Sequence, residues 1–197
     1  TNMDSPLGSA VGNSLEVIES VEILKGKTSG DLWTVCRELS CRMLMLAGIG
    51  DKDECGRLVD EAVESGEALK RFEMMVKLQG GDVSYIEDTS KFRKASFSRE
   101  VYAPADGYIT HMDSEKIGLT AVLLGAGREK KEDNINHAAG IMIAAKAGDF
   151  VKRGELLATL FADNKSRLDG AESRYLSAVS IGDKKPAEQP MILDYID

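Results

Sequence analysis

Long hydrophobic runs and positive charge are both in short supply in this 197-residue sequence. The longest apolar candidate, residues 43–49, is far shorter than the roughly 18–20 residues that cross a bilayer, so we expect no membrane partner. The 25 Lys and Arg residues are outnumbered by 33 Asp and Glu, which gives a formal net charge of −8. Such a chain lacks the positive surface that contacts a phosphate backbone, so we also expect no nucleic-acid partner.

Cysteine is scarce as well. The three cysteines, Cys36, Cys41 and Cys55, form no Cys-x-x-Cys pair and fall in stretches with helical periodicity. Their number and spacing argue against a disulfide framework and against a zinc site. Residues 1–4 also lack the basic and apolar regions of a signal peptide. We therefore expect a cytoplasmic protein.

Apolar residues in the first half of the chain recur at helical spacing. They predict four helices between residues 13 and 79, separated at Gly26, Gly48, Gly66 and Gly80. The second helix is expected to start with a capping box of Thr28 and Asp31. Its apolar residues follow at steps of 4, 3, 4 and 3, which predicts a buried stripe. The stripe consists of Leu32, Cys36, Leu39, Met43 and Leu46.

The second half has the signals of strands and turns. Strands are expected at 100–103, 108–112, 119–124, 140–144, 150–151 and 156–161, with a type I hairpin turn at 104–107 and a short helix at 171–179. The polar, aperiodic stretch between the halves indicates a linker. The sequence thus predicts an α+β chain with a helical part at 1–82, a linker at 83–97 and a β-rich part at 98–197.

Two motifs of the β-rich part could carry chemistry. Residues 101–107 and 148–160 resemble biotinyl or lipoyl carrier domains, which implies a barrel-sandwich fold. Those carriers modify a lysine flanked by methionines, whereas Lys146 lies in Ala-Ala-Lys-Ala, so a scaffold is favoured over a carrier or interaction module. The loop at 125–128, Gly-Ala-Gly-Arg, could contact an anion or could simply dock on a neighbouring domain.

A third candidate lies near the start of the chain. The glycine-containing segment 6–12 precedes Glu19, and loop carbonyls with one carboxylate suit a hard cation. The alternative is that Glu19 lies on the solvated face of its helix.

Several segments, in order along the chain, resemble pyrimidine-nucleoside phosphorylases, including thymidine phosphorylases. The resemblance begins with Pro-Leu-Gly and Gly-Asn-Ser-Leu-Glu-Val within residues 1–19, where Asn2 stands in place of the more usual Asp. It continues through Gln-Gly-Gly-Asp at 79–82 and Ala-Pro-Ala-Asp-Gly-Tyr at 103–108. Further segments are Leu-Gly-Ala-Gly-Arg-Glu-Lys-Lys-Glu-Asp at 124–133, Ala-Gly at 139–140 and Gly-Asp-Phe-Val at 148–151.

The resemblance implies the C-terminal portion of a homodimeric enzyme. In that family phosphate cleaves uridine or thymidine to the free base and a ribose or deoxyribose 1-phosphate. The helices would belong to its large α/β domain, followed by a β-rich, barrel-sandwich or hammerhead-like C-terminal domain. The family's Lys-His-Ser and Gly-Gly-Val-Gly-Asp segments do not occur here, so no catalytic or cofactor-binding residue is assigned to this chain.

One family site does fall on this sequence. The resemblance implies a potassium ion held by the carbonyls of Leu7 and Ala10 and by the carboxylate of Glu19. The family's remaining potassium ligands belong to the phosphate loop, which has no counterpart in these residues.

Overall fold

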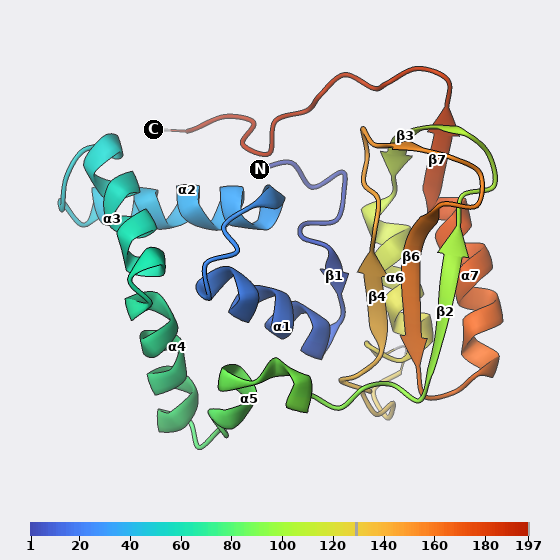
Figure 1. Cartoon of the computed structure of the whole chain (residues 1–197), viewed down its shortest axis with the longest axis horizontal. Coiled ribbons are helices and arrows are strands. Elements are labelled where there is room, and N and C mark those ends of the chain that lie inside the picture. The colour runs from blue at the N-terminus through green and yellow to red at the C-terminus, as the bar shows by residue number, and fades with distance from the viewer. Residues whose placement is uncertain (129, 197) are drawn as a thin grey trace. The chain divides into compact units, whose positions relative to one another are not determined.

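A computed structural model describes residues 1–128 and 130–196 (Figure 1). Glu129, within the motif at 124–133, and Asp197, the last residue of the predicted β-rich part, lie outside the described residues. The helices are α1 (Asn13–Leu24), α2 (Gly30–Leu46), α3 (Lys52–Glu64), α4 (Glu67–Leu78), α5 (Ser84–Glu87), α6 (Ser114–Leu124) and α7 (Ser166–Ala178), with a 3-10 helix, η1 (Thr89–Lys91). The strands are β1 (Ala10–Val11), β2 (Phe97–Tyr102), β3 (Gly107–Met112), β4 (Gly140–Ile143), β5 (Phe150–Val151), β6 (Leu156–Ala162) and β7 (Val179–Gly182).

These elements form two compact units. The first, called here the helical unit, contains Ile18–Lys91 together with Thr1 and Met191–Asp197. The second, the sheet unit, contains Asn2–Val17 and Phe92–Pro190. The predicted α+β class is confirmed, because the chain combines helices with two antiparallel sheets. The domain boundaries predicted at residues 82 and 98 remain a prediction. In the described part of the chain, no helix combines the length and apolarity needed to cross a membrane.

The four helices that the spacing predicts are present, and the helical unit contains α2, α3, α4 and the part of α1 from Ile18 onward. Asp51 caps α3 by accepting a 2.9 Å hydrogen bond from the backbone N–H of Glu54. The predicted capping box of Thr28 and Asp31 at the start of α2 is wrong. Ser29 is the N-cap and its side chain makes no capping hydrogen bond. The carboxylate of Asp31 accepts from the N–H of the next residue, Leu32. The predicted linker also contains regular structure, namely α5 and η1.

The predicted buried stripe on α2 is a second correction. Leu39, Met43 and Leu46 are 52%, 63% and 89% exposed. The buried residues of α2 are Val35 and Cys41 instead. The apolar spacing therefore identified the helix correctly but not the face that it buries.

An ion pair joins α2 to α3. Arg37 of α2 donates two 2.6 Å hydrogen bonds to the carboxylate of Asp60 in α3. A paired fork of this kind fixes geometry as well as adding energy. Leu32, Cys36 and Met43 of the stripe border an open groove together with residues of α3, so they face α3 without being fully buried by it.

The sheet unit is built from two open antiparallel sheets. One has the strand order β1-β4-β6-β2 and the other β5-β3-β7. Because both sheets are open, they do not form the closed barrel that a barrel-sandwich suggests. The turn at 104–107 is not a hairpin: β2 pairs with β6, whereas β3 pairs with β5 and β7. This turn therefore carries the chain from one sheet to the other.

Residues 119–124, expected to form a strand, belong to helix α6. Asp113 caps this helix by accepting a 3.0 Å hydrogen bond from the N–H of Lys116. Ile117, Ala121 and Leu124 follow at helical spacing and are all buried. A short apolar run does not by itself distinguish a strand from a helix, and here the preceding cap and the burial of one helical face decide the outcome.

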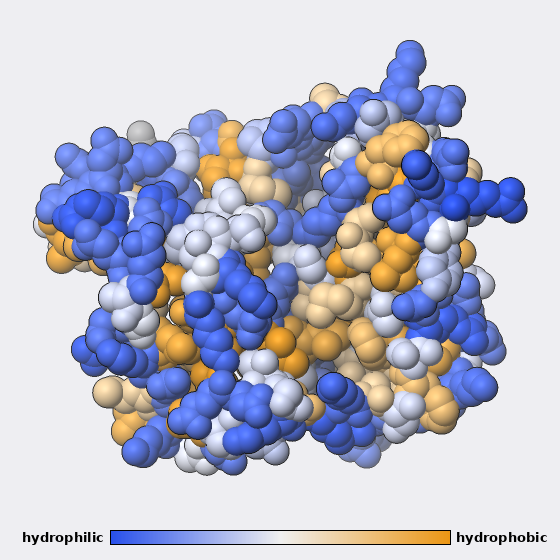
Figure 2. Space-filling view, viewed as in Figure 1, coloured by the Kyte–Doolittle hydropathy of each residue, from blue (hydrophilic) through white to orange (hydrophobic). Residues whose placement is uncertain are grey.

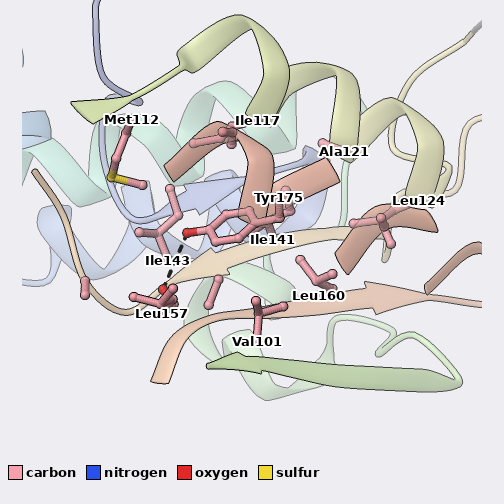
Figure 3. Packing of buried hydrophobic residues seen from close by; sticks show 14 of the residues in the cluster. Val101, Met112, Ile117, Ala121, Leu124, Ile141, Ile143, Leu157, Leu160 and Tyr175 are labelled. Carbon is pink, nitrogen blue, oxygen red and sulfur yellow. Dashed lines mark hydrogen bonds between the residues drawn. The ribbon is translucent and has the colours of Figure 1, made fainter. Parts of the chain in front are cut away.

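The core of the sheet unit lies between the strands and helices α6 and α7 (Figure 3). Tyr175 of α7 is fully buried within it, and its hydroxyl group donates to the carbonyl of Leu157 in β6 at 3.5 Å. Burial raises the pKa of Tyr175, because the charged phenolate would be poorly solvated there. The hydroxyl thus stays protonated and remains a hydrogen-bond donor.

Candidate functional site

The densest polar cluster of the sheet unit is centred on Asp163, just after β6. One carboxylate oxygen accepts from the backbone N–H of Ser96 at 2.8 Å and from its hydroxyl at 3.0 Å. The other accepts from the amide of Asn136 at 2.9 Å and from the guanidinium of Arg93. The cluster therefore fastens the segment ahead of β2 and the loop ahead of β4 to the end of β6.

This arrangement stabilises the charged form of Asp163. The Arg93 hydrogen bond, followed by the Ser96 N–H, holds the pKa of Asp163 well below its ordinary value. Because the folded-state pKa lies below the unfolded one, the contribution to stability is fully present above the unfolded pKa of about 3.9. It is lost as the pH falls through the lower, folded-state pKa. The cluster has the features of a structural clamp.

We expect Asp163→Asn to destabilise the sheet unit most at neutral pH. The difference in free energy of unfolding between wild type and Asp163→Asn should shrink as the pH is lowered from about 7 to about 2. Asp169→Asn is the matched control, because the Asp169 side chain is 75% exposed and its partner Arg99 also holds Glu172. Urea unfolding at several pH values measures the effect. A difference that is independent of pH would contradict the assigned electrostatic role.

Two of the backbone N–H groups in the loop at 125–128 already have partners within the chain. The N–H groups of Gly125 and Ala126 donate to carbonyls of the last turn of α6, at 2.9 and 3.0 Å. The loop also lies at the C-terminal end of that helix, where the dipole disfavours negative charge. Asn13 donates to the carbonyl of Ala126 at 2.8 Å, so the loop packs against the start of α1. Both residues belong to the sheet unit, so docking of the loop on a neighbouring domain stays a prediction.

Lys146 is poorly placed for a carrier lysine. Its ammonium group donates to the carbonyl of Pro6 at 3.0 Å, and the side chain is half-buried. A carrier presents its modified lysine on an exposed hairpin, free to travel between active sites. The carrier alternative is therefore not favoured.

The predicted potassium ligands are distributed over both units. Leu7 and Ala10 lie in the sheet unit, where Ala10 is buried in β1 opposite Met142 of β4. Glu19 lies in α1, in the part assigned to the helical unit. Two carbonyls and one carboxylate have the chemistry that a hard cation requires. The potassium set stays a prediction.

The helical unit carries a feature that the sequence did not reveal, an apolar groove of about 640 Å³. All four long helices of this unit contribute to it, and Figure 2 shows hydrophobic residues reaching the surface over this helical region. None of the described residues that line it is charged. The groove is lined by Ser20, Ile23, Leu24, Leu32, Trp33, Cys36, Ser40, Met43, Leu44, Leu58, Val59, Ala62, Val63, Ala68 and Phe72.

Comparison with known proteins connects both units to one class of enzyme, the nucleoside phosphorylases. Residues 108–182 match the family model described as the pyrimidine nucleoside phosphorylase C-terminal domain. The pyrimidine-nucleoside phosphorylase of Bacillus subtilis (strain 168) is 41% identical over 167 residues, covering 84% of this chain and 39% of the relative. That of Geobacillus stearothermophilus is 34% identical over 194 residues, covering 98% of this chain and 44% of the relative.

These matches confirm the predicted resemblance. In sequence, the chain corresponds to the C-terminal portion of a pyrimidine-nucleoside phosphorylase. It spans about two fifths of the length of the curated relatives it matches.

Proposed function

We propose that this chain supplies the C-terminal portion of a pyrimidine-nucleoside phosphorylase. The intact protein is a pentosyltransferase of nucleoside salvage that cleaves uridine or thymidine with phosphate, and acts in the cytoplasm as a homodimer. The observation that carries the proposal is the continuous similarity to such enzymes along nearly the whole chain, 98% of it in one relative. Within that enzyme we assign this chain a structural role, because the family's phosphate-binding and base-binding motifs are not among its residues.

The reaction itself limits what these residues contribute. An oxygen of phosphate bonds to C1′ of the sugar as the bond from C1′ to the base nitrogen breaks, and the electron pair leaves with the base. Groups that stabilise this charge must converge on the phosphate and on the departing base. The apolar groove of the helical unit has no charged side chain among its described lining residues and cannot serve as such a site.

The test is to join this chain to the N-terminal portion of the Bacillus subtilis relative in one polypeptide. Phosphate-dependent release of uracil or thymine by the purified fusion protein would support the proposal. The N-terminal portion alone and reactions without phosphate are the controls. A folded fusion protein without phosphorolysis of either nucleoside would overturn it.

We further propose that Leu7, Ala10 and Glu19 hold potassium in the intact enzyme, where the ion would stiffen the neighbouring backbone. In the fusion protein, Glu19→Gln should raise the potassium concentration for half-maximal activity by about tenfold or more, because a lost charged contact costs on the order of 1.5–3 kcal/mol. Glu22→Gln is the control, since Glu22 lies on the same helix and pairs with Lys27.

The measurement is a titration of potassium against sodium, following both activity and the thermal midpoint. Equal potassium dependence in wild type and Glu19→Gln would remove Glu19 from the site. An equal effect of Glu22→Gln would show a general loss of negative charge instead.

A further inference from the structure

The segment that leads into β1 carries the two carbonyls of the proposed potassium site, those of Leu7 and Ala10. β1 is paired with β4, which holds Ala10 in place. The N–H of Ile143, at the end of β4, extends this pairing by donating to the carbonyl of Ser9 at 2.7 Å. Leu7 lies ahead of the paired residues, so the direction of its carbonyl depends on a further contact.

Lys146 provides a contact on the other side of Leu7. Its ammonium group donates to the carbonyl of Pro6 at 3.0 Å, and Pro6 is buried. This carbonyl belongs to the planar peptide unit that joins Pro6 to Leu7, so the hydrogen bond fixes the backbone directly ahead of Leu7. A hydrogen bond from a charged donor is about twice as strong as one between neutral groups. Leu7 is therefore held from both sides, by Lys146 and by the bond to Ser9.

The backbone of Lys146 is itself fixed by the turn in which it lies. Its N–H donates to the carboxylate of Asp149 at 2.8 Å, and its carbonyl accepts from the N–H of Asp149 at 3.0 Å. The N–H of Gly148 donates to the carbonyl of Ile109 in β3 at 2.8 Å, which attaches the turn to the second sheet. The side chain of Lys146 therefore extends toward Pro6 from a well-held base.

We propose that Lys146 is a positioning residue for the potassium site, whose hydrogen bond to Pro6 fixes the carbonyl of Leu7 before the ion binds. This inference rests on the proposed function and adds a residue that does not itself contact the ion. Two effects of opposite sign follow. A preordered carbonyl lowers the entropy cost of binding, whereas a neighbouring positive charge repels the ion. The Lys146 side chain is half-buried, so solvent weakens the repulsion, and we expect the first effect to be larger.

The first measurement concerns the segment ahead of β1 and uses this chain. Lys146→Met removes the ammonium group and keeps an unbranched side chain of similar length. The amide of Ile143, which bonds to Ser9, should exchange with solvent at least about fivefold faster, while amides of α2 and α3 keep wild-type rates. Lys152→Met is the matched control, because Lys152 is exposed in the same unit and the change in charge is identical. Unchanged exchange of Ile143 would overturn the proposal.

The second measurement concerns the ion and uses the fusion protein, whose thermal midpoint is followed as potassium replaces sodium. Lys146→Met should raise the potassium concentration for half-maximal stabilisation by at least about fivefold. Lys146→Arg retains a charged donor and should restore most of the potassium affinity. An equal fall in thermal midpoint at every potassium concentration would show a merely structural residue and overturn the proposal. Tighter potassium binding by Lys146→Met, or an equal effect of Lys152→Met, would overturn it as well.

Neither measurement requires phosphorolysis, so the inference and the proposed function can fail separately. Suppose that the fusion protein is inactive toward both nucleosides but is stabilised by potassium, and that Lys146→Met weakens this stabilisation. That result would reject the proposed function and retain the positioning role of Lys146. A wild-type fusion protein whose thermal midpoint does not respond to potassium would overturn the inference, whether or not the protein is active.

Discussion

Incubated alone with phosphate and either uridine or thymidine, this chain is expected to release no base above a control without protein. Phosphorolysis requires a clamp for a multiply charged phosphate and donors for the departing base. The Lys-His-Ser and Gly-Gly-Val-Gly-Asp segments that supply the clamp in the resembling family do not occur in the 197 residues. The groove of the helical unit has, among its described lining residues, no charged side chain that could replace them.

The fusion protein should exceed the isolated chain by at least about a thousandfold in the rate of base release, since removal of a single preorganised donor already costs about a hundred- to a thousandfold in other enzymes. Chromatographic separation of base from nucleoside measures both rates. Protein prepared from a host that lacks its own nucleoside phosphorylases is required. Release of base by the isolated chain in such a preparation would show that it contains a catalytic site, contrary to the structural role proposed for it.

The helices and most strands could be predicted from local sequence signals. In the helical unit, glycines at 26, 48, 66 and 80 adopt left-handed backbone angles where the predicted helices end. Asp51 caps α3 because its side chain can reach the exposed N–H of Glu54. Such signals act over a few residues and need no knowledge of the rest of the fold.

The errors concern properties that depend on distant contacts. The stripe on α2 is apolar, but its burial depends on a second layer, and in the described structure Met43 and Leu46 are 63% and 89% exposed. The turn at 104–107 has hairpin residues, yet β2 takes its partner from β6, far along the chain. The groove was missed because it is formed by several helices whose relative arrangement no local pattern specifies.

The second large effect is expected from Gly140→Ala, at the start of β4. Gly140 has a φ of +154°, and a Cβ there would lie 2.5 Å from the carbonyl oxygen of Val11 and 3.0 Å from Leu15. Gly12 lies against the same part of β4. It has a φ of +143°, and a Cβ added to it would lie 2.7 Å from the carbonyl oxygen of Ala139. Backbone atoms cannot yield as a flexible side chain can, so β1 and β4 must separate.

We expect Gly140→Ala to reduce the free energy of unfolding of the sheet unit by about 3 kcal/mol, combining a backbone penalty with an unrelieved steric overlap. Gly154→Ala isolates the first contribution, because Gly154 has a φ of +83° and its Cβ would meet nothing within 4 Å. That control should cost about 1 kcal/mol. If both variants lost the same stability, the close approach of Gly12 and Gly140 would contribute nothing.

Hydrogen exchange is the appropriate measurement, because the single tryptophan, Trp33, lies in the helical unit and its fluorescence would not follow the sheets. In Gly140→Ala, amides of β1 and β4 should exchange faster, while those of α2 and α3 keep wild-type protection. Ala10 lies in β1, so the same variant of the fusion protein should also lose potassium dependence if Ala10 holds the ion. Loss of β1 protection with unchanged potassium dependence would remove Ala10 from the cation site and leave its role in pairing with Met142 intact.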